Sequence, residues 1–181
     1  VTIPAGGTLT SNVSESSGLG WWSGDPSSLT VEGTWEFSAN GGNLWLSDAF
    51  NSGPSTLIVR GNAVMNIGGA ILSARDDASF SVEGNAIINV PNDGFRLPYY
   101  DFGAGTLNHS FNLQDNATIT VEGSFGFAGD SIGVGTMSGG LLDIGSFVSG
   151  DEDTFTFSGG TIKVDGNQLP WNSARSWFVV G

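Results

Sequence analysis

Polar and apolar side chains alternate along short stretches of this chain, and this alternation predicts its fold class. In residues 79–90, and again in residues 55–71, the apolar side chains fall on one phase and a Gly-Asn pair interrupts the run. The residues on that phase are Leu57, Val59, Ala63, Met65 and Ile67 in one stretch and Phe80, Val82, Ala86, Ile88 and Val90 in the other. A period of two predicts strands with one buried face, and the glycine suits a bend between two strands.

A Val-Glu/Arg-Gly tripeptide ends several of these strands. It occurs at residues 31–33, 59–61, 82–84 and 121–123, and a degenerate unit follows at 154–159. Units that recur in this way cannot bury an apolar face alone and become stable when they stack on their neighbours. The sequence therefore predicts an all-β parallel β-solenoid, or β-helix, of irregular coils, in which the four valines of the tripeptide point inward in one stack.

An antiparallel β-sandwich is the alternative fold class, with each Gly-Asn pair as a hairpin turn. The tripeptide favours the solenoid, because sandwich strands face different neighbours and have no reason to share residues at equivalent places. We expect a single domain over residues 1–181 with strand-like termini. Loop excursions are expected near 11–28 and 91–105, where glycine and proline gather.

Composition excludes several classes of partner. The 18 acidic and 5 basic residues give a formal net charge of −13, which repels nucleic acid and anionic membrane surfaces. There is no cysteine, and no apolar run approaches the ~20 residues that a membrane-spanning helix needs. The chain starts at Val1 and not at methionine, and we expect an export signal that has been removed. We therefore expect an extracellular or cell-surface protein without nucleic-acid binding or membrane insertion.

Side chains that could carry catalysis are present but form no diagnostic pattern. The candidates for a polysaccharide-degrading solenoid are His109, Arg75, Asp76, Asp77, Arg96 and Asp101, and an acidic run at 150–154 has oxygen ligands for a hard cation. Their spacing matches no calcium-loop pattern. Glu32, Arg60 and Glu83 form a predicted row of alternating charge along the stack, which Glu122 continues. We expect a protein that is not an enzyme, with no catalytic residue, no cofactor and no metal site.

Aromatic side chains in the expected loops are a sharper signal. Trp21 and Trp22 lie in one excursion, and Phe95, Tyr99 and Tyr100 lie in the other. Exposed rings can stack on sugar rings or anchor a protein partner. These five rings therefore either contact a carbohydrate or protein partner, or fold back to cover one end of the core.

The repeat units resemble those of a known class of proteins. Units in the style Ser/Thr-x-Val-Glu-Gly-Asn-Ala, with Gly-Gly pairs at 41–42, 68–69, 139–140 and 159–160, are similar to exported bacterial β-strand-repeat surface proteins. These include autotransporter-passenger-like repeats and proteins with a C-terminal Pro-Glu-Pro sorting signal, a signal that this sequence lacks. The resemblance covers residues 27–166 and implies an extracellular role without chemistry.

Apolar strand-like residues at both termini predict self-assembly. The expected interface residues are Val1, Thr2, Ile3, Trp177, Phe178, Val179 and Val180. Strand edges at the two ends of a solenoid invite head-to-tail pairing, which yields an open filament if the rotation does not close a ring. We expect an extracellular structural protein that forms a homopolymer: a filament, sheath or surface layer. The alternative is a carbohydrate-binding or polysaccharide-degrading β-helix protein that uses the aromatic loops.

Overall fold

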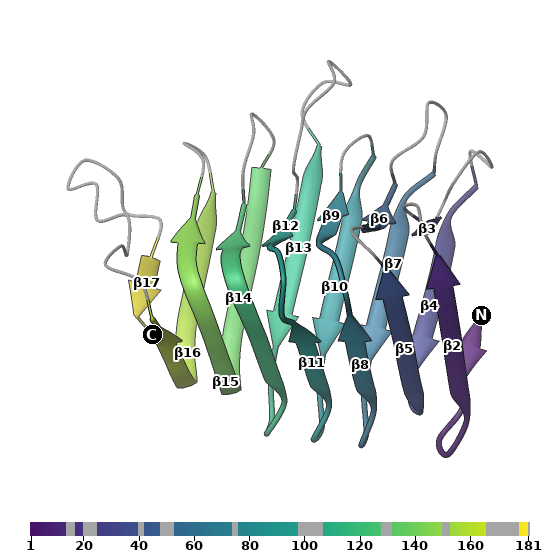
Figure 1. The fold of residues 1–181 in the computed structure, drawn as a ribbon. Coiled ribbons are helices and arrows are strands. Elements are labelled where there is room, and N and C mark those ends of the chain that lie inside the picture. Colours follow the sequence, from purple (N-terminus) through teal and green to yellow (C-terminus); the bar gives the residue numbers. More distant parts are fainter. Residues whose placement is uncertain are drawn as a thin grey trace.

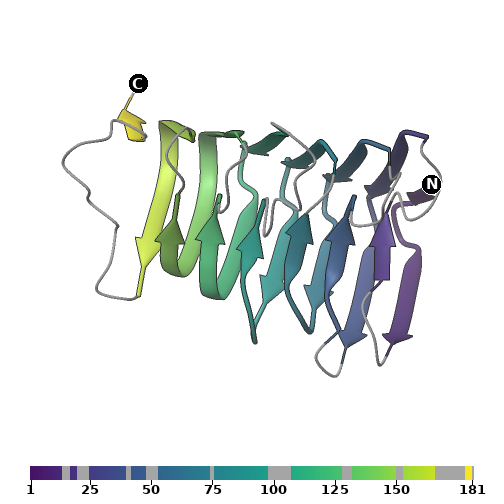
Figure 2. The same cartoon turned by 90° about the horizontal axis from the view of Figure 1, so that it is seen from above.

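The fold is a parallel β-solenoid, as the sequence predicts. The computed structural model describes residues 1–13, 17–19, 25–39, 42–47, 53–73, 76–97, 107–127, 132–149, 153–165 and 178–180. All regular structure in these ranges is β-strand, and no helix there could span a membrane. Every strand pairing among these residues is parallel, which excludes the antiparallel sandwich. Successive coils stack from the N-terminal end to the C-terminal end (Figures 1 and 2).

Three parallel sheets form the walls of the solenoid. The first sheet contains β1 (Thr2–Ile3), β4 (Ser27–Val31), β7 (Ser55–Val59), β10 (Ala78–Val82), β13 (Asn108–Leu113), the first parts of β15 (Ile132–Val148) and β16 (Thr154–Val164), and β17 (Phe178–Val180). The second sheet contains β2 (Thr8–Val13), β5 (Thr34–Ala39), β8 (Val64–Ile67), β11 (Ile87–Val90), β14 (Thr118–Gly126) and later parts of β15 and β16. The third sheet contains β3 (Ser17–Leu19), β6 (Leu44–Leu46), β9 (Ile71–Ser73), β12 (Phe95–Arg96) and the ends of β14 and β15.

The inward-facing residues stack in columns along the solenoid. In the first sheet, Val31, Val59 and Val82 lie in register and are fully buried, as predicted. The prediction that Val121 continues this column is wrong, although Val121 is buried. Leu113 follows Val82 in the first sheet, whereas Val121 lies in the second sheet.

The turn between the first and second sheets shows which segments are equivalent. Gly61 and Gly84 take the left-handed conformation there, with φ of 72° and 74°, and Asp115 takes it with φ of 62°. Asp is one of the few non-glycine residues that tolerate this region. The next residue in each turn is asparagine, and these side chains form a ladder in which Asn116 donates to Asn85 and Asn85 donates to Asn62. Residues 110–117 are therefore the true counterpart of residues 79–86.

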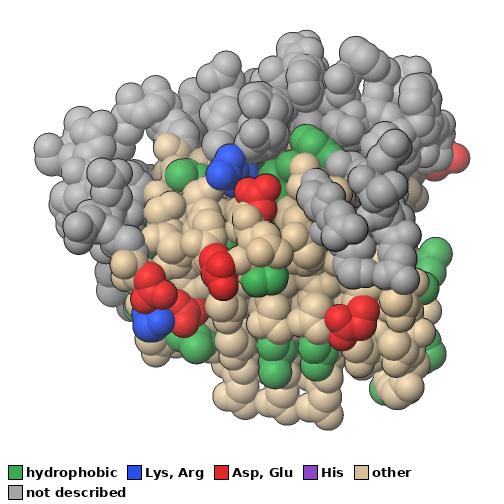
Figure 3. All heavy atoms as spheres, viewed as in Figure 1, with side chains coloured by type: hydrophobic (Ala, Val, Ile, Leu, Met, Phe, Trp, Pro, Cys, Tyr) green, Lys and Arg blue, Asp and Glu red, His purple; other side chains and the backbone are tan. Residues whose placement is uncertain are grey.

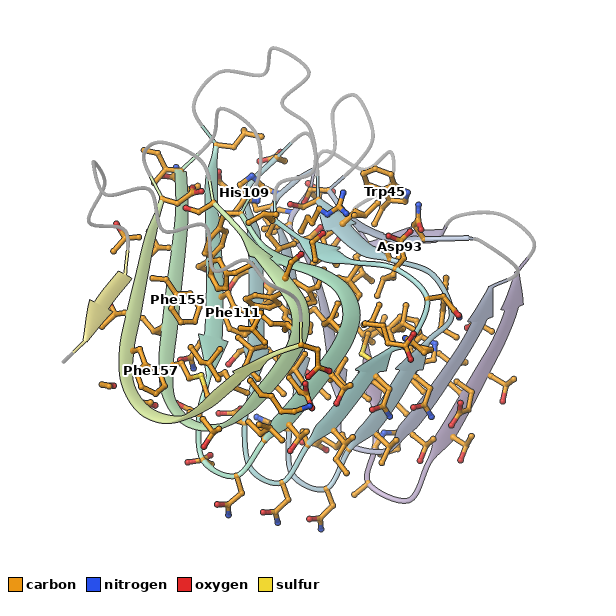
Figure 4. All side chains as sticks on the ribbon, turned by 60° about the vertical axis from the view of Figure 1, so that its left-hand side comes forward. Trp45, Asp93, His109, Phe111, Phe155 and Phe157 are labelled. Carbon is orange, nitrogen blue, oxygen red and sulfur yellow. The ribbon has the colours of Figure 1, made fainter. Side chains whose placement is uncertain are left out.

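Phenylalanine rings fill the C-terminal half of the core. They are Phe80, Phe95, Phe111, Phe125, Phe147 and Phe155, with centroids of contacting rings 4.9 to 6.4 Å apart. Figure 4 shows Phe111 and Phe155 inside the coil. Contacts at these distances tie successive coils together by apolar burial.

Both segments in which loop excursions are expected contain a short strand among their described residues. Within 11–28, β3 pairs with β6, and within 91–105, β12 pairs with both β9 and β14. Proline and glycine flank β12, which keeps this strand to two residues without removing it from the sheet.

Candidate functional site: the two ends, the turn notch and the buried histidine

The expected assembly residues lie at opposite ends of one sheet. Val1 leads into β1, and among the described strands β1 pairs only with β4. Residues 178–180 form β17, whose one described pairing is with β16. Trp177 lies outside the described residues. The two segments expected to join copies are thus the two outermost strands of the first sheet.

Backbone groups at the N-terminal end point away from the solenoid. Thr30 N–H donates to Val1 O (2.9 Å) and Glu32 N–H donates to Ile3 O (2.8 Å), so Val1 and Ile3 face β4. Alternate residues of a parallel strand bond to the same neighbour. The N–H and C=O of Thr2 therefore face away from β4, toward the open end.

Strand β2 offers a longer open edge beside β1. Thr34 N–H donates to Gly7 O (2.9 Å), which fixes the side of β2 that pairs with β5. By the same alternation, Thr8 and Thr10 direct their N–H and C=O groups to the open end. A row of such groups is a template for pairing with another strand.

The apolar core is also open at this end. Leu9 lies in register with Trp35 and, one coil further, Met65. Trp35 is 5% exposed and Met65 is 0% exposed, but Leu9 is 41% exposed. No described strand covers Leu9, so the first coil leaves part of the inward-facing column in contact with solvent.

The lateral face in Figure 3 contrasts with this end. On the view that shows the second sheet, apolar and acidic side chains are scattered among uncharged polar ones. Scattered single apolar residues are normal on a protein surface. In the described residues of this face, no broad apolar patch competes with the N-terminal end as a contact surface.

The aromatic contact prediction fails for Phe95. This side chain is 1% exposed and packs among Phe80, Phe111 and Phe125. Its place in β12 points it into the core, so it cannot contact a sugar or a partner. The remaining predicted contact residues, Trp21, Trp22, Tyr99 and Tyr100, lie outside the described residues. Trp45, half-buried on β6, is an aromatic side chain that sequence analysis did not single out.

His109 is part of the buried interior and not of an open catalytic site. It faces inward from β13, is 1% exposed, and its Nδ1 lies 3.1 Å from Ser73 Oγ. Ser73 is 0% exposed, so a polymeric substrate has no path to this pair. Because nucleophile and base must both reach the substrate, the geometry indicates a structural Ser-His contact.

Two of the acidic candidate residues accept hydrogen bonds from backbone N–H groups. Asp77 Oδ1 accepts a hydrogen bond from Asn108 N–H (2.8 Å), and Asp153 Oδ1 accepts one from Gly133 N–H (2.8 Å). Arg96 Nε donates to Ser124 Oγ (2.6 Å). The described residues contain no group of three His, Asp or Glu side chains that could hold a metal ion. Arg75, Asp101 and residues 150–152 lie outside the described ranges.

A notch opens where one turn is short. Two residues join β4 to β5, whereas four join β7 to β8, so the turn at Glu32–Gly33 is recessed. The resulting notch of about 630 Å³ lies between Ala5–Gly6 on one side and Gly61–Asn62 on the other. Arg60 Nη2 lies 2.6 Å from Glu32 Oε1 beside it, which confirms the predicted pairing of these two charges.

No aromatic side chain of the described residues lines the notch, so it offers no ring for stacking on a sugar. The Arg60 and Glu32 side chains are 49% and 30% exposed, so solvent screens their attraction. Glu122 lies on β14, where the chain passes from the second to the third sheet, and does not continue the charge row.

Charge at the C-terminal end centres on Lys163. Its Nζ lies 3.1 Å from Asp143 Oδ2 and 3.0 Å from Asp165 Oδ1. Hydrogen bonds to Asp165 and Asp143 raise the pKa of Lys163 above its ordinary value. This ammonium group therefore stays charged at neutral pH and offsets the carboxylates of Asp143 on β15 and of Asp165 just after β16.

Comparison with known proteins adds no functional assignment: no protein-family model matches the chain, and neither a curated protein nor a solved structure shows significant similarity to it.

Proposed function

We propose that this chain is an extracellular structural protein whose solenoids join end to end into a polymer. The observation that carries the proposal is the N-terminal end, where Thr2, Thr8 and Thr10 direct backbone groups outward next to the 41% exposed Leu9. An added strand would satisfy those backbone groups and bury that side chain together. Natural solenoids usually cover such an end with a capping element.

The extracellular location rests on composition and resemblance. The sequence has no cysteine, carries a formal charge of −13 and is rich in Ser, Thr and glycine, like the exported repeat proteins that it resembles. A structural role needs a repetitive scaffold and joining surfaces, but no catalytic group. The described residues supply the scaffold, and the open N-terminal end is the surface to which the proposal assigns the joining of copies.

Proline substitution at Thr10 tests the proposal. The Thr10 N–H faces the open end, so proline removes no hydrogen bond within the solenoid but places a ring where an incoming strand must pair. Thr10→Val is the matched control, because it keeps the N–H group. We expect the parent and Thr10→Val to form polymers in sedimentation velocity and negative-stain microscopy, while Thr10→Pro stays monomeric with an unchanged circular dichroism spectrum.

Two results would reject the proposal. One is polymer formation by Thr10→Pro equal to that of Thr10→Val, which would place the contact elsewhere. The other is a parent protein that remains folded and monomeric at high concentration. An unfolded Thr10→Pro variant would be replaced by Thr8→Pro, since Thr8 N–H faces the same way.

A further inference from the structure

The strands β1 and β17 occupy equivalent positions in the first sheet. Through the successive strand pairs, Ile3 is in register with Val31 at one end and Phe157 is in register with Val180 at the other. The intervening pairs join these two ends in one column: Val31 to Val59, Val59 to Val82, Val82 to Leu113, Leu113 to Met137, and Met137 to Phe157. A second copy could therefore add β1 to this sheet without any change of register.

The C-terminal end is uneven, and this restricts how a second copy can dock. Strand β17 covers residues 155–157 of β16, but no described strand covers residues 161–164, which belong to the second sheet. Figures 1 and 2 show β17 beside one part of β16 only. The first sheet thus extends one strand further than the second sheet.

Docking on top of β17 leaves a gap. At the N-terminal end, β1 and β2 belong to the same coil, so both strands lie at the same level along the solenoid axis. If β1 of a second copy pairs with β17, its β2 lies two strand spacings from β16, about 9.6 Å, where a hydrogen-bonded neighbour needs about 4.8 Å. One sheet would then be continuous and the other broken.

Docking in place of β17 closes both sheets. In that arrangement Val1, Thr2 and Ile3 of the second copy pair with residues 155–157, and residues 8–11 pair with 161–164 by the established register. The exposed Leu9 then covers Ile162, a partly buried side chain that packs against the core. β17 supplies three residue pairs, whereas the incoming coil supplies those three and four more.

We infer that β17 is an exchangeable cap, which competes with β1 of a second copy for the same edge of β16. The inference rests on the proposed end-to-end assembly and adds a contact that regulates it. While β17 is paired with β16, a second copy cannot pair with both the first and the second sheet at the C-terminal end. When β17 leaves, β16 presents its full edge to the first coil of the next copy. Short edge strands that block further pairing are a common protective device in sheets.

Two proline variants in β17 separate a cap from a connector. Because Thr30 N–H points back to β1 and the register is continuous, Val179 N–H points back to β16, while Val180 N–H points away from it. Val179→Pro therefore detaches β17 from β16. Val180→Pro keeps β17 attached and blocks only its outer edge, which makes it the matched control.

The experiment measures the concentration at which polymer appears, by light scattering with negative-stain microscopy. For a cap, we expect Val179→Pro and deletion of residues 178–181 to lower that concentration about tenfold or more, which corresponds to about 1.4 kcal/mol. Val180→Pro should behave like the parent. The double variant Val179→Pro/Thr10→Pro should not polymerise, because the incoming edge is blocked.

The outcomes also distinguish this inference from the proposed function. If Val179→Pro and Val180→Pro both suppress polymer that the parent forms, β17 is a connector; the cap is then excluded and the end-to-end function stands. If parent, Val179→Pro and the deletion all remain folded monomers, the proposed function fails and the cap fails with it. Circular dichroism on each variant confirms that the repeats are folded.

Discussion

Replacing Phe95 by alanine tests whether the aromatic column holds the coils together. The Phe95 ring is 1% exposed, and its centroid lies 4.9 Å from Phe80, 5.7 Å from Phe111 and 5.0 Å from Phe125. Truncating a buried phenylalanine costs about 3–5 kcal/mol, and the lost ring contacts keep this site away from the lower end of that range. The expected loss of about 4 kcal/mol is a large part of the ~5–15 kcal/mol stability of a domain.

Urea unfolding followed by circular dichroism measures this loss. With a slope of about 2 kcal/mol per molar, a loss of about 4 kcal/mol lowers the midpoint by about 2 M. Phe95→Leu is the control, because it keeps most of the apolar volume and should shift the midpoint much less. An unchanged midpoint for Phe95→Ala would refute the buried position and restore Phe95 as a surface contact residue.

Two further predictions concern the recessed turn. Gly33→Ala should destabilise the first coil and speed amide exchange in β1 and β2, because an added Cβ would overlap the carbonyl oxygens of Gly7 and Pro4. Gly6→Ala is the control. Gly6 has open space around it, so this variant should show only the strain of a left-handed residue. Inserting Gly-Asn between Glu32 and Gly33 should raise the midpoint of thermal unfolding, because the two residues fill the notch and extend the asparagine ladder beyond Asn62. A lower midpoint would show that the short turn is required.

The fold class was predictable because two independent signals agree. Strict alternation identifies strands with one buried face, and the recurring turn identifies units that stack. Both signals are local, so they survive irregular coil lengths. Between paired positions, coils range from 20 residues (Met137 to Phe157) to 31 residues (Val82 to Leu113), and the inward phase is kept throughout.

Assigning each repeat to its coil was harder. Val121-Glu122-Gly123 matches the tripeptide but lies on β14, where the chain passes from the second to the third sheet. The tripeptide suits both turns, because at each one a strand ends on an inward-facing apolar residue, Val82 in the first sheet and Val121 in the second, before the chain turns a corner. The sequence Asp-Asn-Ala at 115–117, equivalent to Gly-Asn-Ala at 84–86, was the signal that could have corrected the register.

Phe95 shows a second limit of sequence reasoning. Nearby proline and glycine indicate a loop, and they do shorten the strand, but two residues are enough to direct one side chain inward. The open groups of Thr2 and Thr10 were equally hidden, since the direction of a backbone N–H depends on which neighbour the strand pairs with. The apolar residues of the termini were therefore enough to propose the two ends as contact segments. Proposing different roles for β1 and β17 required the register of the strand pairs.

The net charge and the terminal strand control different steps of the proposed assembly. Each copy carries a formal charge of −13, so two approaching copies repel until salt screens them, over a Debye length of about 8 Å at physiological ionic strength. Screening acts on encounter and should raise the assembly rate of the parent and Val179→Pro alike. Release of β17 acts on pairing, so the difference in threshold concentration between these two proteins should persist at every salt concentration. A difference that vanished at high salt would mean that charge, and not a shared strand position on β16, limits the joining of copies.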